Sequence, residues 1–169
     1  TVTIPAMLAA TLLFTALAPV ALLVAALLAA TVPALRGAVR CYLFGLAFVW
    51  CEAFGILASA WLWLRHGVAA APGTPRHERF LEANFRLQCA WAGALAAAGE
   101  RLFRLGWDVE GDDALAGPPC LLMPRHASMG DTVLGVVLYA APQHRRLRHV
   151  LKRELLFDPC LDIVGNRLS

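Results

Sequence analysis

Two long apolar runs occupy most of the first 64 residues. No ionisable side chain occurs from Ala6 to Leu35, and Glu52 is the only charged residue from Cys41 to Leu64. A helix that crosses the hydrocarbon core of a bilayer needs about 20 apolar residues, at about 1.5 Å each. The pattern therefore predicts two transmembrane helices. The connector between them, residues 36–40, is short enough for an antiparallel hairpin.

Three residues refine this hairpin. Pro19 lies inside the first run, where a proline kinks a helix, and Pro33 suits its end. A charge in the middle of a bilayer costs about 2.5 to 3.5 kcal/mol, so we expect Glu52 to face protein or to be protonated. A secretory signal peptide is the competing interpretation of the first run, but the run is longer than a typical h-region and no basic segment precedes it.

The hydrophobic pattern changes after residue 68. A linker rich in alanine, proline and glycine covers residues 69–76, and apolar residues then recur at helical spacing over 77–105. Short apolar or alternating runs predict strands at 107–110, 120–123 and 147–151, with a helix at 132–141 between the last two. The order helix, strand, strand, helix, strand predicts an α/β domain. The predicted organisation is thus a membrane anchor at 1–68, the linker at 69–76 and an α/β domain over 77–169.

Composition agrees with a membrane protein. Hydrophobic residues make up 59% of the chain and charged residues 16%, which is more apolar surface than a soluble domain of this length readily buries. The formal net charge of +3 does not indicate nucleic-acid binding. The five cysteines are scattered without zinc-site spacing, so neither a metal site nor a disulfide framework is predicted. The basic stretch at 143–149 would attract anionic groups, or form an ordinary solvated surface.

The segment with the clearest chemistry is Pro124-Arg125-His126-Ala127-Ser128-Met129-Gly130-Asp131. Five helical residues separate two side chains by roughly 140°, so His126 and Asp131 can meet only if the chain turns between them. Gly130 permits a turn, and Asp131 would then begin the following helix and reach back to the imidazole. A histidine oriented by a carboxylate is a competent general base near neutral pH. In the alternative, Asp131 only caps the helix and His126 is an ordinary loop histidine.

This segment resembles the first motif of the glycerolipid acyltransferases, the family that includes lysophosphatidic acid acyltransferases. That motif is a histidine, four variable residues and an aspartate after a hydrophobic strand. Leu151-Lys152-Arg153-Glu154-Leu155-Leu156, with Pro159 and Gly165, is similar to a second block of the family. The family often has asparagine where this chain has Arg125, and its later blocks do not occur before Ser169. The resemblance therefore covers about the second half of the chain, and we expect this stretch alone to be inactive.

The resemblance implies a membrane-bound enzyme of phospholipid biosynthesis. It would transfer a fatty acyl group from acyl-CoA or acyl carrier protein, as co-substrate, to a hydroxyl of a lysophospholipid or glycerol phosphate. His126 would take the hydroxyl proton, Asp131 would orient the imidazole, and no metal or other cofactor is implied. The residues implied in substrate binding are Arg125, Lys152, Gly165 and Arg167. Basic residues after the second apolar run favour a cytoplasmic catalytic part.

Two other functions fit the sequence less well. Ser128 could be the nucleophile of a lipid hydrolase with His126 as its base, but a serine two residues from its base has awkward geometry and no Gly-x-Ser-x-Gly elbow is present. The chain could also be a membrane scaffold without catalytic activity, in which the second half only packs.

Overall fold

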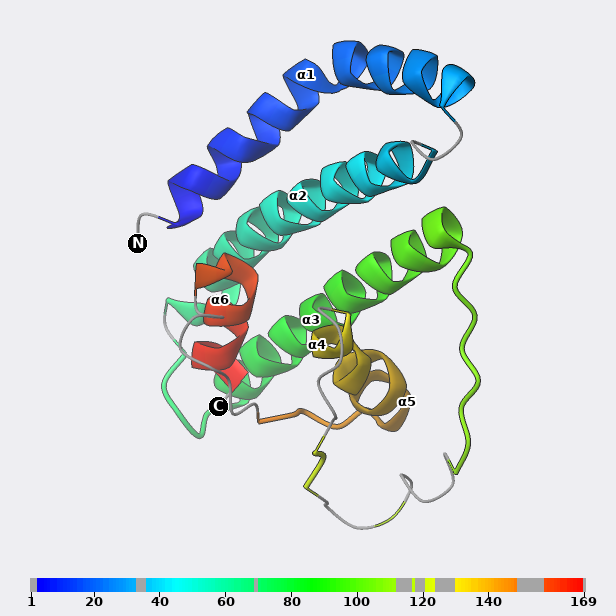
Figure 1. Ribbon diagram of the computed structural model, residues 1–169. Helices are drawn as coiled ribbons and strands as arrows, with labels where there is room; N and C mark the ends of the chain where they lie inside the picture. The colour runs from blue at the N-terminus through cyan, green and yellow to red at the C-terminus, as the bar shows by residue number, and fades with distance from the viewer. Residues whose placement is uncertain are drawn as a thin grey trace.

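The computed structural model describes most of the chain, namely residues 3–32, 36–68, 70–111, 117, 121–123, 130–148 and 157–168. Its longest elements are three helices of similar length, α1 (Thr3–Thr31), α2 (Arg36–Leu62) and α3 (Pro75–Phe103) (Figure 1). A single π-helical turn, η2 (Trp63–Gly67), continues α2. The shorter elements follow in the second half: α4 (Asp131–Leu134), η4 (Gly135–Ala140), α5 (Ala141–Gln143) and α6 (Pro159–Leu168).

The predicted α/β class is wrong, because the part of the chain that the structure describes contains helices and irregular connections but no strand. Residues 107–110, 121–123 and 147–148, which were expected in strands, lie in such connections. Residue 120 and residues 149–151 fall outside the description. Leu121 and Met123 are 83% and 84% exposed instead of buried in a sheet. A strand needs a paired neighbour to persist. The buried apolar side chains of this half, such as Val136 and Leu168, pack between helices instead.

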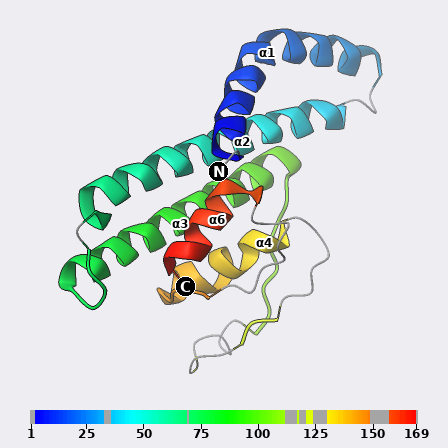
Figure 2. The ribbon, with the colours of Figure 1, turned by 90° about the vertical axis from the view of Figure 1, so that its left-hand side faces the viewer.

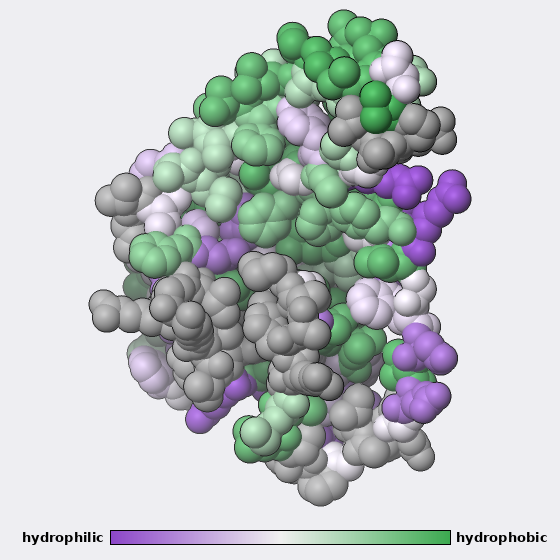
Figure 3. All heavy atoms as spheres, in the orientation of Figure 1, coloured by the Kyte–Doolittle hydropathy of each residue, from purple (hydrophilic) through white to green (hydrophobic). Residues whose placement is uncertain are grey.

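The predicted helical hairpin is confirmed. The segments Thr3–Thr31 and Gly37–Gly67 are both long and apolar enough to cross a membrane. Large apolar side chains on α1 point outward, with Leu12 72% and Leu23 62% exposed, and α1 forms a hydrophobic surface in Figure 3. Such a continuous apolar face indicates a lipid surrounding or a partner rather than water.

Helix α1 bends near its middle, where Pro19 lies (Figure 1). Proline has no N–H to donate to the carbonyl of Thr15, and its ring presses on that turn, so a kink is expected there. The hydroxyl of Tyr42 on α2 donates to the carbonyl oxygen of Phe14, at 2.9 Å, next to the weakened turn. The two aromatic rings stack with centroids 6.0 Å apart.

Further polar contacts hold the first half of α1 on α2. The Thr11 hydroxyl donates to the Val49 carbonyl at 3.0 Å, and Trp50 Nε1 donates to Thr15 Oγ1 at 3.0 Å. In an apolar surrounding such hydrogen bonds position two helices relative to each other. Among the described residues, the polar contacts between α1 and α2 come from Thr11, Phe14 and Thr15 of α1, so they hold the half before the bend.

Helix α3 forms as predicted and lies alongside α2. Thr74 caps its first turn, with Oγ1 accepting from the His77 N–H at 3.2 Å, and Pro75 follows at the first helical position. Figures 1 and 2 both show α3 running next to α2, with α6 across the pair. At the far end the rings of Phe44 and Phe103 lie 5.5 Å apart.

The second half of the chain packs on α3. The predicted helix at 132–141 is confirmed as the continuous run from α4 through η4 to α5. One buried cluster joins it to α3 and α6, and its members are Phe85, Ala92, Val136, Ala140 and Leu168. Helix α3 therefore carries both the helix that begins at Asp131 and α6.

Gly55 of α2 lies directly against α6. A Cβ at this position would lie 2.6 Å from Cys160 Sγ and 3.5 Å from a ring carbon of Trp91. We expect Gly55→Ala to lower the free energy of unfolding by about 1 to 2 kcal/mol, because overpacking outweighs the better helix propensity of alanine. Thermal unfolding in detergent measures this.

Gly93 on α3 is the matched control, since a Cβ there meets nothing within 4 Å. Gly93→Ala should be neutral or stabilising by up to about 1 kcal/mol. Removing the opposing atom with Cys160→Ala should restore part of the stability that Gly55→Ala loses. Equal stability of the Gly55 and Gly93 variants would show that the close approach is not a constraint.

Candidate functional site

Asp131 occupies the position predicted for it. It is the first residue of α4 and is half-buried. Gly130 precedes it in a right-handed helical conformation, with φ −64° and ψ −25°, so the left-handed freedom of glycine is not used there. A carboxylate at the start of a helix is stabilised by the partial positive charge of the helix N-terminus. The structure thus places Asp131 at the start of a helix, and its role in orienting His126 stays a prediction.

The other predicted site residues fall in two groups. His126, Arg125 and Lys152 lie outside the described residues, and their roles stay predictions. Gly165 and Arg167 lie on α6, which packs on α3 next to the helix that begins at Asp131. The structure therefore brings the helix that begins at Asp131 and the helix that carries Gly165 and Arg167 together through the apolar cluster on α3.

Groups of both α2 and α3 contact the side chain of Arg167. Its Nη1 lies within hydrogen-bond distance of the Ser59 carbonyl and hydroxyl, at 2.9 and 2.5 Å, and of Asn84 Oδ1 at 3.0 Å. The guanidinium also lies 5.3 Å from the centre of the Phe80 ring. Burial lowers the pKa of Arg167 below its usual value. These contacts fix the C-terminal end of α6, and the predicted phosphate contact of Arg167 stays a prediction.

Glu52 fixes the other end of α6. Its side chain is fully buried, which confirms that it faces protein. Trp91 Nε1 donates to Oε1 at 2.9 Å, and the backbone N–H of Cys160 donates to Oε2 at 3.4 Å. The carboxylate thus lies at the N-terminus of α6, where the helix dipole favours negative charge. One acidic residue in an apolar run joins α2, α3 and α6.

Asp158 caps the same turn of α6. Its Oδ1 accepts from the backbone N–H of Leu161 at 3.0 Å. Burial raises the pKa of Asp158, and hydrogen bonds from Leu161, Glu52 and Cys160 only partly oppose this. A hydrogen bond between two carboxyl groups requires a proton on one of them. The Glu52 and Asp158 carboxyl groups thus both contact the first turn of α6, through the Cys160 and Leu161 N–H groups.

This contact predicts a pH dependence of stability. A carboxyl group whose pKa is raised by folding stabilises the folded state when protonated, and this contribution is lost as pH rises from about 4 through the raised value. Asp158→Asn keeps a good N-cap and removes the titrating group. We expect the wild type to lose stability over this pH range and Asp158→Asn to lose less, measured by thermal unfolding in detergent. Asp108→Asn, on an exposed connection, should behave like the wild type.

Burial also raises the pKa of the Cys160 thiol, with the nearby Glu52 carboxyl adding to the shift. A protonated thiol is a weak nucleophile, and its Sγ lies 3.6 Å from the Glu52 carbonyl oxygen, to which it can donate. Cys160 is therefore suited to packing between α6 and α2. Among the described residues no group of three or more metal-ligating side chains comes together.

Part of the predicted basic stretch pairs with α3. Arg146 Nη2 lies 3.0 Å from Glu78 Oε2, and His144 Nε2 lies 3.3 Å from Glu82 Oε1. Exposed pairs of this kind contribute about 0 to 1 kcal/mol, so they orient the segment more than they stabilise it. The attraction of this stretch for anionic groups stays a prediction.

The sequence did not predict α6 or the contacts of Glu52 and Asp158 with its first turn. Asp158-Pro159 is a helix-start pattern, with a capping residue followed by proline at the first helical position. That pattern could have predicted the helix but not its contact with Glu52, since 106 residues separate Asp158 from Glu52 in the chain. No family model, curated protein or solved structure matches the chain.

Proposed function

We propose that this protein is a membrane-bound O-acyltransferase that transfers a fatty acyl group from a thioester to a lysophospholipid or glycerol phosphate. The observation that carries the proposal is the spacing of His126 and Asp131, with Asp131 at the first residue of α4. The supporting frame is α3, on which the helix from Asp131 packs.

In the proposed reaction His126 accepts the proton of the acceptor hydroxyl as its oxygen attacks the thioester carbonyl. Asp131 holds the imidazole in one tautomer and stabilises the imidazolium that forms. The tetrahedral intermediate then collapses, the C–S bond breaks, and the thiolate leaves with the proton from His126. The products are the acylated lipid and a free thiol. No covalent enzyme intermediate is needed, and positioning the two substrates supplies much of the rate.

The hydrophobic hairpin supports this reaction because the acyl donor and a lysophospholipid acceptor both carry hydrocarbon chains. Helices α1 and α2 would keep the site at the membrane surface, where acceptor and acyl chain are concentrated. Arg125 and Lys152 are proposed to contact the phosphate of the acceptor or donor, since cationic donors suit that group. The catalytic part is proposed to face the cytoplasm, where acyl-CoA and acyl carrier protein are soluble.

Product analysis tests the proposal against hydrolysis. Membranes that contain the complete gene product are given acyl-CoA with a labelled acyl group and lysophosphatidic acid, and lipid products are separated. Transfer yields labelled phosphatidic acid, whereas hydrolysis yields labelled free fatty acid. Ser128→Ala should leave transfer within about threefold of wild type, and complete loss of turnover in this variant would favour a serine hydrolase.

A further inference from the structure

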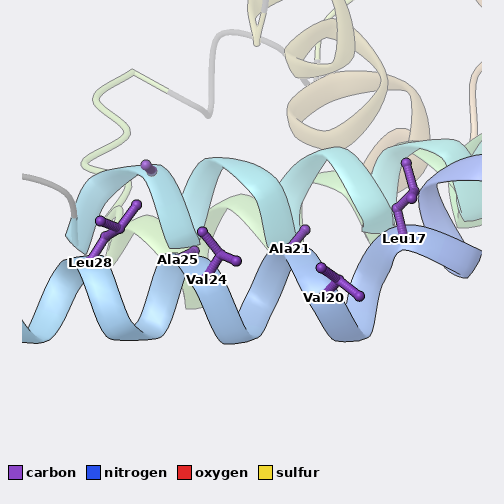
Figure 4. A pocket seen from close by; sticks show the side chains of 7 residues that line it. Leu17, Val20, Ala21, Val24, Ala25 and Leu28 are labelled. Carbon is purple, nitrogen blue, oxygen red and sulfur yellow. The ribbon is translucent and has the colours of Figure 1, made fainter.

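An apolar groove lies between the second half of α1 and the beginning of α2. Its volume is about 410 Å³. Figure 4 shows the lining side chains of α1 along the side that faces α2. The groove is lined by Leu17, Val20, Ala21, Val24, Ala25 and Leu28 of α1 and by Ala38 of α2. Every one of these residues is apolar.

The bend at Pro19 and the small side chains together form the groove. Among the described residues, the hydrogen bonds between α1 and α2 lie at or before Thr15, and beyond Pro19 the helix takes a different direction (Figure 1). Alanines at positions 21, 25 and 38 leave space where larger side chains would fill it. Because the residues that line the groove beyond the bend are apolar, an apolar molecule can lie between the two helices.

The chemistry of the groove favours a hydrocarbon chain. An apolar site without polar partners does not hold ordered water. The neighbouring faces of α1 are exposed and apolar, and α1 is long enough to cross a membrane, so lipid chains are the molecules that surround it. A chain in this groove replaces loose contacts with close packing, which is what stabilises association inside a bilayer.

Positively charged side chains lie at one end of the groove. Ala38 lines the groove, and Arg40, less than one helical turn further along α2, is exposed. The end of α3 lies beside this part of α2, through the Phe44–Phe103 contact, and adds the exposed Arg101 and Arg104. Glu100, also at this end, accepts a hydrogen bond from Trp107. The balance is positive, so an anionic phosphate group is favoured there.

We propose that this groove binds one acyl chain of an anionic phospholipid of the membrane, with the headgroup at the level of Arg40. The lipid chain would lie between α1 and α2 beyond the bend and so hold the two helices in one relative position. The residues that line this groove do not include Asp131, and lipid binding here goes beyond acyl transfer as a function. It stands or fails independently of that activity.

Retention of lipid by the complete gene product tests the proposal. The protein is reconstituted with equal amounts of phosphatidylglycerol and phosphatidylcholine, extracted in mild detergent and analysed by native mass spectrometry. The wild type should retain one phospholipid per chain, predominantly phosphatidylglycerol. Ala25→Phe fills the groove and should reduce retention at least tenfold. Ala26→Phe, on an exposed side of α1 outside the groove, should retain lipid like the wild type.

Two more variants keep the result interpretable. Ala38→Leu fills the groove from α2 and should also reduce retention, so the outcome does not depend on α1 alone. Arg40→Gln should retain a lipid but lose the preference for phosphatidylglycerol. Equal retention by the wild type, Ala25→Phe and Ala38→Leu would overturn the proposal and indicate lipid bound around the hairpin without a site. A wild type that retains no phospholipid would overturn it as well.

Discussion

Replacing His126 with alanine is expected to reduce acyl transfer by about 100-fold to 10,000-fold, the range over which general-base catalysis contributes. The acceptor hydroxyl has a pKa far above neutral, so it attacks a thioester slowly unless a base removes its proton during attack. Alanine offers no base. The thiolate remains a good leaving group in the variant, so a residual rate from positioning should survive. Initial rates of labelled product formation at equal protein abundance in membranes measure the loss.

Two variants separate chemistry from folding in this experiment. Asp131→Asn retains a side chain that suits the start of α4 but removes the negative charge that supports the imidazolium, so we expect a loss of about 10-fold or more with little change in stability. His144→Ala removes an exposed histidine that pairs only at the surface with Glu82, and it should retain nearly full activity. A His126→Ala protein as active as His144→Ala would exclude the general-base role.

Replacing Glu52 with alanine is expected to have the largest effect on stability, about 3 kcal/mol or more. The change leaves Trp91 Nε1 and the Cys160 N–H without their acceptor in a buried setting, and it opens a cavity where three helices meet. Helix α6 would then lose its N-terminal contact, with Arg167 remaining at the other end. Thermal unfolding in detergent, followed by circular dichroism, should show a large drop in midpoint temperature.

Glu52→Gln is the conservative comparison, because its amide keeps an acceptor for Trp91, and it should lose less than half as much stability as Glu52→Ala. Glu78→Ala removes an acidic residue whose side chain is 59% exposed, and it should change stability by less than about 1 kcal/mol. If Glu52→Ala unfolded at the same temperature as Glu78→Ala, the buried carboxylate would not anchor α6.

The long elements could be predicted from the sequence because each carries a long, regular pattern. The two apolar runs predicted the hairpin, the helical spacing after residue 77 predicted α3, and Asp131 was placed correctly at the start of a helix. Glu52 was expected to face protein, since a charge isolated in an apolar run has few other stable environments. These inferences depend on local patterns and on the cost of burying a charge.

The short elements could not be predicted in the same way. An apolar run such as 120–123 fits a buried strand and a connection equally well, and pairing partners elsewhere in the chain decide between them. The contact of Glu52 with Cys160, and the close approach at Gly55, depend on how α6 returns across α2 and α3. A glycine in a helix can reflect packing or nothing at all, so Gly55 carried no interpretable pattern.

The most direct test of the central claim is the fate of the labelled acyl group in membranes that contain the wild-type gene product or His126→Ala at equal abundance. The expected result is labelled phosphatidic acid from lysophosphatidic acid and acyl-CoA with the wild type, and a yield at least 100-fold lower with His126→Ala. Carrier-protein donors and other lysolipids extend the same assay. Labelled product in equal yield from both proteins, or none from the wild type with any donor and acceptor, would contradict acyl transfer by the His126 and Asp131 pair.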